Sequence, residues 1–316
     1  MTTSGSTDYS ETRNEIIIDA LYAINVLAGN EQPTDDQLQI ANRQLNRMAK
    51  DWQKYGLHLW KKATGFLFPQ KGQREYNLYA SGAHASESYA ETTMTAGLAA
   101  TFKTLTVADS SDFSVNDQVG VVLDSGYFHW SVIDLIPDST TIRMVTGLPT
   151  LASSGNKVYG YTTKLTQPIN FYSANRLTPS GVEIPLNYLS YAEYFDLPTK
   201  NQTGVITSYN YDRQRDYALI RLWYVPDSVQ DLVSFTFERK IEDFNHPDNT
   251  ADFPQEWLDA LTVNLAPRLA KFFGKNQGEK YNNLVLEAKE SLEAMLSFDN
   301  EPGSIFFRPS EQGRGR

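Results

Sequence analysis

The amino-terminal end of the chain carries apolar residues at the three- and four-residue spacing of a helix. A capping-box pattern, Thr12 followed by Glu15, marks the start of the first such segment. Gly29 suits the position just beyond a helix, so we expect the helix to end there, buried on most sides. Its regularly spaced apolar residues are Ile17, Ala20, Leu21, Ile24 and Ala28.

A second helix is predicted after Pro33, where Thr34 and Gln37 repeat the capping-box pattern. Gly56 is expected to end it. The apolar stripe of this segment is Leu38, Ala41, Leu45, Met48 and Trp52. A stripe of this kind is typical of packing against partner helices, so we interpret it as core and not as a ligand site.

The middle of the chain has the shorter period of strands. Leu57, Leu59, Phe66 and Phe68 suggest strands, closed by Pro69. Residues 66–100 are assigned to a loop or extended connection, of low local stability because residues 70–100 are small and polar. Residues 101–165 predict a small β domain, a sandwich or barrel, with turns at 124–126, 137–138 and 154–156. Residues 166–249 predict a further β-rich segment, with one short helical turn ended by Pro198.

Helical spacing returns near Pro254, which suits the first turn of a helix. Pro267 lies inside the pattern and should kink that helix, which we expect Gly274 to close. The apolar residues of this helix are Trp257, Leu258, Leu261, Leu265, Leu269, Phe272 and Phe273. A last helix should place Tyr281, Leu284, Val285, Ala288, Leu292 and Met295 on one face.

The two terminal helical pairs predict the domain organisation, because neither pair can bury its stripe alone. We therefore expect an α+β fold in which residues 1–65 and 250–300 form one discontinuous helical bundle and the β-rich region is a long insertion. The expected helical core is Leu38, Leu45, Met48, Trp52, Trp257, Leu261 and Leu265. In the remaining tail, 301–316, the apolar run 305–307 should either fold back or dock on another subunit.

Composition adds few constraints on the function. The 316 residues include no cysteine, which excludes disulfides and thiolate chemistry and fits assembly in a reducing cytosol. The longest apolar run, 16–28, is interrupted by polar residues and is too short to span a bilayer. The first ten residues contain no lysine or arginine, so we expect no signal peptide.

The formal net charge of −10 excludes a simple nucleic-acid binder, which needs clustered lysine and arginine. The stretch 75–141 contains nine carboxylates and a single base, Lys103. Two readings stay open for it: an ordinary solvated acidic surface, or a surface that lies near DNA without holding it.

No motif for chemistry is apparent. The four histidines, His58, His84, His129 and His246, are not at metal-ligand spacing, and no nucleophile or phosphate-binding motif occurs. Glu183 and Glu193 have apolar neighbours and are candidates for the protonated acid of a glycosidase, although an exposed strand or turn position explains them better. We therefore predict no catalytic, cofactor-binding or metal-binding residues and no enzymatic activity.

Both ends of the chain resemble a known family. The run IIIDALYAINVLAGNEQPTDDQLQIANRQLNRMAKDWQKYGLHLW resembles the start of head-to-tail adaptor proteins of short-tailed bacteriophages, also called packaged-DNA stabilisation or tail tubular proteins. The run FPQEWLDALTVNLAPRLAKFFGKNQGEKYNNLVLEAKESLEAMLSFDNEPGSIFF is similar to their carboxyl-terminal end, and residues 189–240 are similar to their longer versions. The resemblance covers about two thirds of the chain and leaves out residues 70–165.

The resemblance implies a structural protein of the virion neck, assembled in the host cytoplasm. Its subunits would form a ring, usually of twelve, that extends the DNA channel beneath the portal protein, helps to retain packaged DNA and offers a platform for other tail proteins. DNA would pass without specific binding, and no membrane is involved. Contact with the portal would come from Ile305, Phe306, Phe307 and Arg308. Two alternatives stay open: a peptidoglycan-degrading tail enzyme, and a carbohydrate- or receptor-binding tail module built on 101–165.

Overall fold

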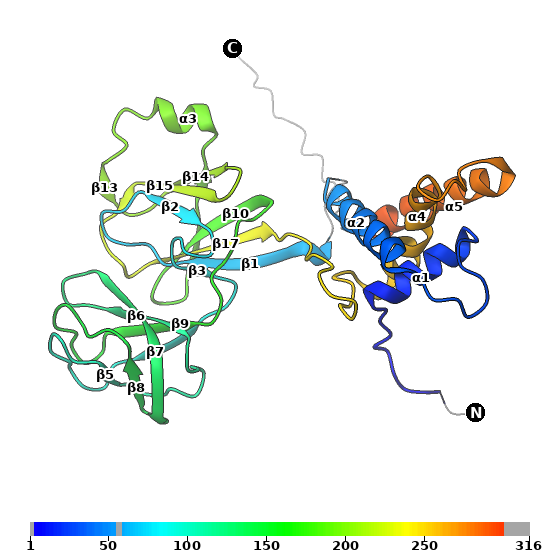
Figure 1. Cartoon of the computed structure of the whole chain (residues 1–316). Coiled ribbons are helices and arrows are strands. Elements are labelled where there is room, and N and C mark those ends of the chain that lie inside the picture. Colours follow the sequence, from blue (N-terminus) through cyan, green and yellow to red (C-terminus); the bar gives the residue numbers. More distant parts are fainter. Residues whose placement is uncertain (1–2, 55–58, 300–316) are drawn as a thin grey trace, which may run out of the picture. The chain divides into compact units, whose positions relative to one another are not determined.

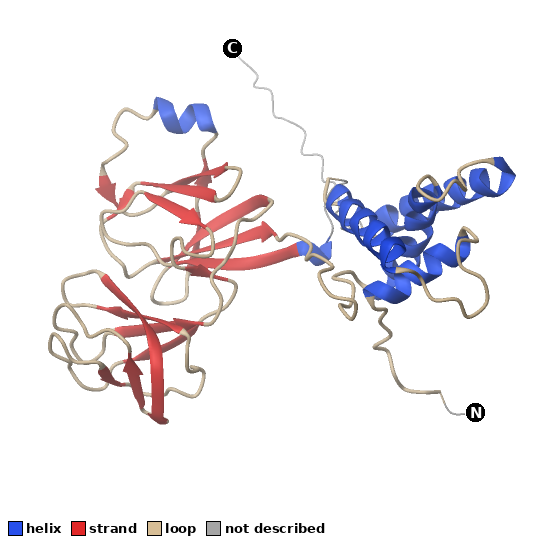
Figure 2. Cartoon of the chain, viewed as in Figure 1, coloured by secondary structure: helices blue, strands red, loops and turns tan. Residues whose placement is uncertain are grey.

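The computed structural model describes residues 3–54 and 59–299. The fold is mixed α+β and mostly β-rich. The chain divides into two compact units: a helical unit, Met1–Lys61 with Lys240–Arg316, and a β unit, Lys62–Arg239. Figure 2 shows that the strands belong to the β unit, whereas the long helices belong to the helical unit.

The helical unit is built from segments at both ends of the chain (Figure 1). α4 contacts α1, α2 and α5, and one hydrophobic cluster holds buried residues of all three helices α1, α2 and α4. The helices are α1 (Arg13–Ala23), α2 (Asp35–Trp52), α4 (Leu258–Ala270) and α5 (Gly278–Phe298), with short 3₁₀ helices at Leu59–Lys61 and Gln255–Trp257.

The helix starts follow from local chemistry. The predicted capping boxes at Thr12 and Thr34 are confirmed: each threonine side chain accepts from the N–H three residues on, and Glu15 or Gln37 accepts from the threonine N–H. Two orphan backbone donors are thereby satisfied at each start.

The end of α1 differs from the prediction, because the helix stops six residues before Gly29. Asn25 adopts a φ of 53°, its N–H donates to the Tyr22 carbonyl, and the N–H of Val26 donates to the Leu21 carbonyl. These two bonds form a Schellman motif. Among the amino acids other than glycine, asparagine is one of those that best tolerate the left-handed region. Ala28 is consequently exposed and outside the helix. Gly56, the predicted end of α2, lies outside the described residues.

The carboxyl-terminal helices also differ in detail from the prediction. Pro254 precedes the 3₁₀ helix instead of occupying the first turn of an α-helix, and α4 continues through Pro267. In α5, Val285 belongs to the predicted apolar face but is 42% exposed. Ala288 alone among the residues of α5 is buried.

Two sheets of the β unit share one core, with buried residues such as Leu67, Tyr76, Ile220 and Phe235. The five-stranded sheet is antiparallel, in the order β11–β10–β17–β1–β3, and the other has the order β12–β14–β15–β2. The strands are β1 (Lys62–Leu67), β2 (Glu75–Leu78), β3 (Ala85–Ser86), β10 (Asn170–Leu177), β11 (Glu183–Pro185), β12 (Asn187–Tyr188), β14 (Ser208–Arg213), β15 (Ala218–Trp223) and β17 (Leu232–Glu238). A parallel pair, β13 (Thr203–Gly204) with β16 (Val225–Pro226), and the short helix α3 (Tyr191–Asp196) complete this part, and α3 confirms the helical turn predicted before Pro198.

The third large sheet has its own core, in the order β4–β9–β6–β7–β8–β5. Its strands are β4 (Ala90–Thr93), β5 (Thr104–Thr106), β6 (Gln118–Val122), β7 (Phe128–Asp138), β8 (Thr141–Met144) and β9 (Lys157–Tyr161). A fourth cluster joins this sheet to the rest of the β unit, with Phe68 and Leu232 meeting Phe128, Tyr159 and Tyr161.

Residues 66–100 differ from the predicted loop or extended connection, because the short strands β2, β3 and β4 lie in this segment. β2 pairs with β15, β3 with β1 and β4 with β9, so each of these short strands is held by a partner remote in sequence. The sequence of a short strand carries only a weak signal for strand formation. Most of its stability comes from pairing with the neighbouring strand. Pro137 and Asp138, predicted as a turn, lie at the end of β7, and the chain turns just after them.

Candidate functional site

The predicted helical core residues come together in one cluster of the helical unit. Leu45, Met48, Trp52, Trp257, Leu261 and Leu265 are all buried there, whereas Leu38 is half-buried at its edge. The Trp52 ring lies 5.6 Å from the Trp257 ring and 6.0 Å from that of Phe253. These contacts give the residues a structural role. The predicted portal-contact residues, Ile305, Phe306, Phe307 and Arg308, lie outside the described residues.

The two candidate acids of a glycosidase are both exposed. Glu193 belongs to the capping box of α3, and the hydrogen bond from the Ser190 N–H lowers the pKa of its carboxyl. Glu183, on β11, accepts a 2.7 Å hydrogen bond from the Asn175 amide. A general acid of this class needs a desolvated site, and both of these side chains are exposed to solvent.

In the described part of the chain, no group of three histidine, aspartate or glutamate side chains is arranged to hold a metal ion. His84 lies instead in an aromatic cluster. Its ring stacks on Trp130 at 3.9 Å, and its Nδ1 lies 2.6 Å from the Tyr161 hydroxyl. Burial lowers the His84 pKa to about 3, with a smaller contribution from the positive charge of Lys164, so this ring is neutral at physiological pH.

Several carboxylates of the acidic stretch hold turns of the six-stranded sheet. Asp109 and Asp138 each accept from a backbone N–H two residues on, and Asp124 accepts from the N–H of Ser153. Hydrogen bonds to these carboxylates lower the pKa of all three. Asp-x-Ser and Asp-x-Thr are Asx-turn patterns, so the sequence contained a signal for two of them. Neither earlier reading of the stretch included this structural role.

The α5 helix carries an apolar face that the helical unit covers only in part. Tyr281, Leu284, Leu292 and Met295 pack against the helical core but stay half-buried. Val285 and Leu286 are 42% and 57% exposed, and Phe298 at the end of the helix is 70% exposed. A helix with this much exposed apolar surface is suited to contact with another protein surface.

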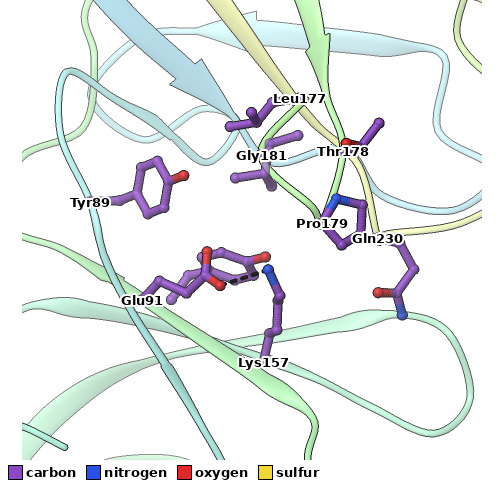
Figure 3. Close-up of a pocket in the computed structure, with 10 residues that line it drawn as sticks. Tyr89, Glu91, Lys157, Leu177, Thr178, Pro179, Gly181 and Gln230 are labelled. Atoms are coloured by element: carbon purple, nitrogen blue, oxygen red, sulfur yellow. Dashed lines mark ion pairs between the residues drawn. The ribbon is translucent and has the colours of Figure 1, made fainter. Parts of the chain in front are cut away.

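A pocket of about 160 Å³ lies within the β unit, between the edge of the six-stranded sheet and the ends of β10 and β17. Figure 3 shows Tyr89 opposite Thr178, Pro179 and Gln230, with the Glu91–Lys157 ion pair beside them. The Glu91 carboxylate is 2.6 Å from the Lys157 ammonium. The full lining is Tyr89, Glu91, Lys157, Tyr159, Leu177, Thr178, Pro179, Gly181, Gln230 and Leu232.

Comparison with known proteins identifies no relative: no family model matches the chain, and no curated protein is significantly similar to it. Within 3–54 and 59–299, no helix is both long and apolar enough to cross a bilayer.

Proposed function

We propose that this chain is a head-to-tail adaptor of a short-tailed bacteriophage, a structural virion protein and not an enzyme. Its copies would form a ring, of about twelve subunits as the family resemblance implies, beneath the portal protein. The ring would extend the DNA channel, help to retain packaged DNA and offer a platform for other tail proteins. Such a protein would be assembled in the host cytoplasm and would reside in the neck or tail of the virion.

The observation that carries the proposal is the half-covered apolar face of α5 on a unit made from both chain ends. In a cyclic ring one patch of each subunit meets a different patch of its neighbour, so a subunit alone leaves apolar surface exposed. In this proposal the helices act as a bundle whose α5 face receives the neighbouring copy. Val285, at the edge of that face, and Leu286, on the opposite side of the helix, are exposed apolar residues that a neighbouring copy would bury.

The charge of the chain is compatible with the proposal. A channel that passes DNA rapidly must not hold phosphates, and a net-negative wall repels them over roughly 8–10 Å at physiological salt. The net charge of −10 is compatible with such a wall, and hydrogen bonds lower the pKa of the Asp109, Asp124 and Asp138 carboxyls further.

Native mass spectrometry of the purified full chain, with and without portal protein, tests the proposal. We expect a closed oligomer, or one that forms on the portal, and its loss when Val285→Asp and Leu286→Asp are combined. The matched control is Val115→Asp, at an apolar position of the β unit that is 47% exposed, which should leave the oligomer intact. A chain that stays monomeric and ignores the portal would refute the adaptor role.

The attachment to the portal has a separate test in the tail. Phe306→Asp combined with Phe307→Asp should abolish portal binding, because the charged side chains cannot enter an apolar site. The chain should otherwise fold and self-associate as before. Unchanged portal binding by this variant would show that the tail is not the anchor.

A further inference from the structure

The pocket between the six-stranded sheet and the β10–β17 ends has walls that the fold holds in place. On one side, β4 and β9 pair in register, with Glu91 opposite Tyr159. On the other, residues 178–182 form a tight turn in which the Thr178 N–H donates to the Val182 carbonyl and the Thr178 hydroxyl bonds the same residue. The Arg176–Asp231 ion pair, 2.7 Å long, ties the end of β10 before this turn to the segment that contains Gln230, just before β17.

The polar groups of the pocket balance in charge. Glu91 and Lys157 neutralise each other across 2.6 Å, and their side chains are 36% and 23% exposed, so both reach the pocket. A charged ligand would be repelled by whichever of these two groups has the same sign of charge. To avoid that repulsion it would have to separate the Glu91–Lys157 pair. An uncharged ligand can accept from the ammonium and donate to the carboxylate without disturbing the pair.

Two tyrosine hydroxyls add further hydrogen-bonding capacity. Burial raises the pKa of Tyr89 and, with the negative charge of Glu91, that of Tyr159, so both hydroxyls stay protonated. Within the described part of the chain neither hydroxyl has a hydrogen-bond partner, although the Tyr159 residue as a whole is only 1% exposed. Tyr159 is one of the residues that line the pocket.

The size and the apolar part of the lining restrict the ligand further. A cavity of about 160 Å³ is close to the roughly 150 Å³ that accepts one benzene-sized ring. Leu177, Pro179 and Leu232 contribute apolar surface, and the Tyr89 ring is fixed by an edge contact with Phe66 at 4.8 Å. The lining therefore combines an aromatic ring, apolar surface and several neutral or paired polar groups.

We propose that this pocket binds one uncharged pyranose ring of a carbohydrate. Adjacent hydroxyls of such a ring can bridge Glu91 and Lys157, while its C–H surface lies against Tyr89 and the apolar wall. Thr178 and Gln230 supply further hydrogen bonds from the opposite side (Figure 3). This inference does not rest on the adaptor role, and either can fail without the other.

Saturation-transfer NMR on the full chain tests the pocket, with glucose, galactose, mannose and N-acetylglucosamine as probes at millimolar concentration. We expect at least one of these sugars to bind. Glucuronate and glucosamine should bind at least about tenfold more weakly than that sugar, since each carries an unpaired charge. Disaccharides that contain the preferred sugar show whether the natural ligand is a free monosaccharide or the end of a glycan. A site for a glycan should bind the disaccharide at least as tightly as the monosaccharide. No transfer to any neutral sugar, or equal binding of the charged ones, would overturn the proposal.

Matched variants locate the binding. Glu91→Gln keeps the shape of the side chain but removes the charge balance, and it should weaken sugar binding about tenfold. Tyr89→Phe keeps the ring and removes the hydroxyl, with an expected loss of about twofold to tenfold. Asp134→Asn, which breaks the similar 2.6 Å ion pair with Arg143 elsewhere on the same sheet, should leave sugar binding unchanged. Sugar binding that survives both pocket variants, each with an unchanged melting temperature, would place the site elsewhere.

Discussion

Asn46 and Phe244, which are 198 residues apart in the sequence, exchange two hydrogen bonds. The Asn46 amide donates to the Phe244 carbonyl at 3.3 Å, and the Phe244 N–H donates to the Asn46 side-chain oxygen at 3.0 Å. One side chain of α2 thus satisfies both backbone groups of a residue in the segment that returns from the β unit. The Lys50–Asp243 ion pair, 2.7 Å long, reinforces the same junction.

Replacing Asn46 should therefore destabilise the helical unit. Asn46→Leu leaves the N–H and the carbonyl of Phe244 without these partners, and we expect the free energy of unfolding to fall by about 1–3 kcal/mol in urea denaturation. Asn264→Ala is the control, because among the described residues the Asn264 amide donates only along its own helix, to Ala260. Equal losses of unfolding free energy for the two variants would show that the Asn46–Phe244 hydrogen bonds do not stabilise the helical unit.

Trp52 should be among the most costly single deletions in the helical core. Its side chain is 2% exposed and contacts the rings of Phe253 and Trp257. Trp52→Ala should lower the free energy of unfolding by about 3–5 kcal/mol, as large core deletions do. Tyr9→Ala, at a position 65% exposed, should change it by less than about 0.5 kcal/mol. Calorimetric melting of both variants checks the contrast. An unaltered melting temperature for Trp52→Ala would show that Trp52 does not contribute to the core.

Gly120 on β6 makes room for the Trp130 ring. A Cβ built at Gly120 would lie 2.6–2.8 Å from three atoms of that ring, so Gly120→Ala must displace the tryptophan from its stack on His84. We expect a loss of about 1–3 kcal/mol. Gly97→Ala is the matched control, since its Cβ would meet its nearest neighbour at an ordinary 3.6 Å. The change in tryptophan fluorescence and the melting temperature report the effect, and similar behaviour of the two variants would contradict it.

The buried His84 makes stability depend on pH. In the folded chain its pKa is about 3, below the ordinary 6.5, so between these values the unfolded chain binds one more proton. Its contribution to stability is complete above pH 6.5 and is lost as the pH falls toward 3, at up to about 1.4 kcal/mol per pH unit. His84→Phe preserves a ring against Trp130 but removes this titration.

The measurement is the slope of the unfolding free energy between about pH 5 and 6.5, where carboxyl groups titrate little. We expect the slope to be smaller in His84→Phe than in the parent chain. His129, whose pKa burial also lowers, contributes to the slope of both proteins alike. Identical slopes would mean that the unfolded and folded chains hold His84 in the same protonation state.

The candidate pocket shows where prediction from the sequence stops. Glu91, Lys157 and Gln230 carry no motif, and they are 66 and 73 residues apart along the chain (157 − 91 and 230 − 157). They meet because β4 pairs with β9 and because the Phe68, Tyr159 and Leu232 side chains join the two parts of the β unit. The mutual burial of these aromatic and aliphatic side chains depends on contacts that no local pattern encodes.

By itself the sequence determined the features that arise from neighbours along the chain: the capping boxes at Thr12 and Thr34, the α2 stripe, and the strand segments from β5 to β9. Each rests on a backbone bond or a side-chain period within a few residues. Only the tertiary structure decided that residues 75–93 pair as strands and that Asn46 holds Phe244. Helix hydrogen bonds close over four residues, whereas strand hydrogen bonds and core contacts need partners that only the folded chain brings together.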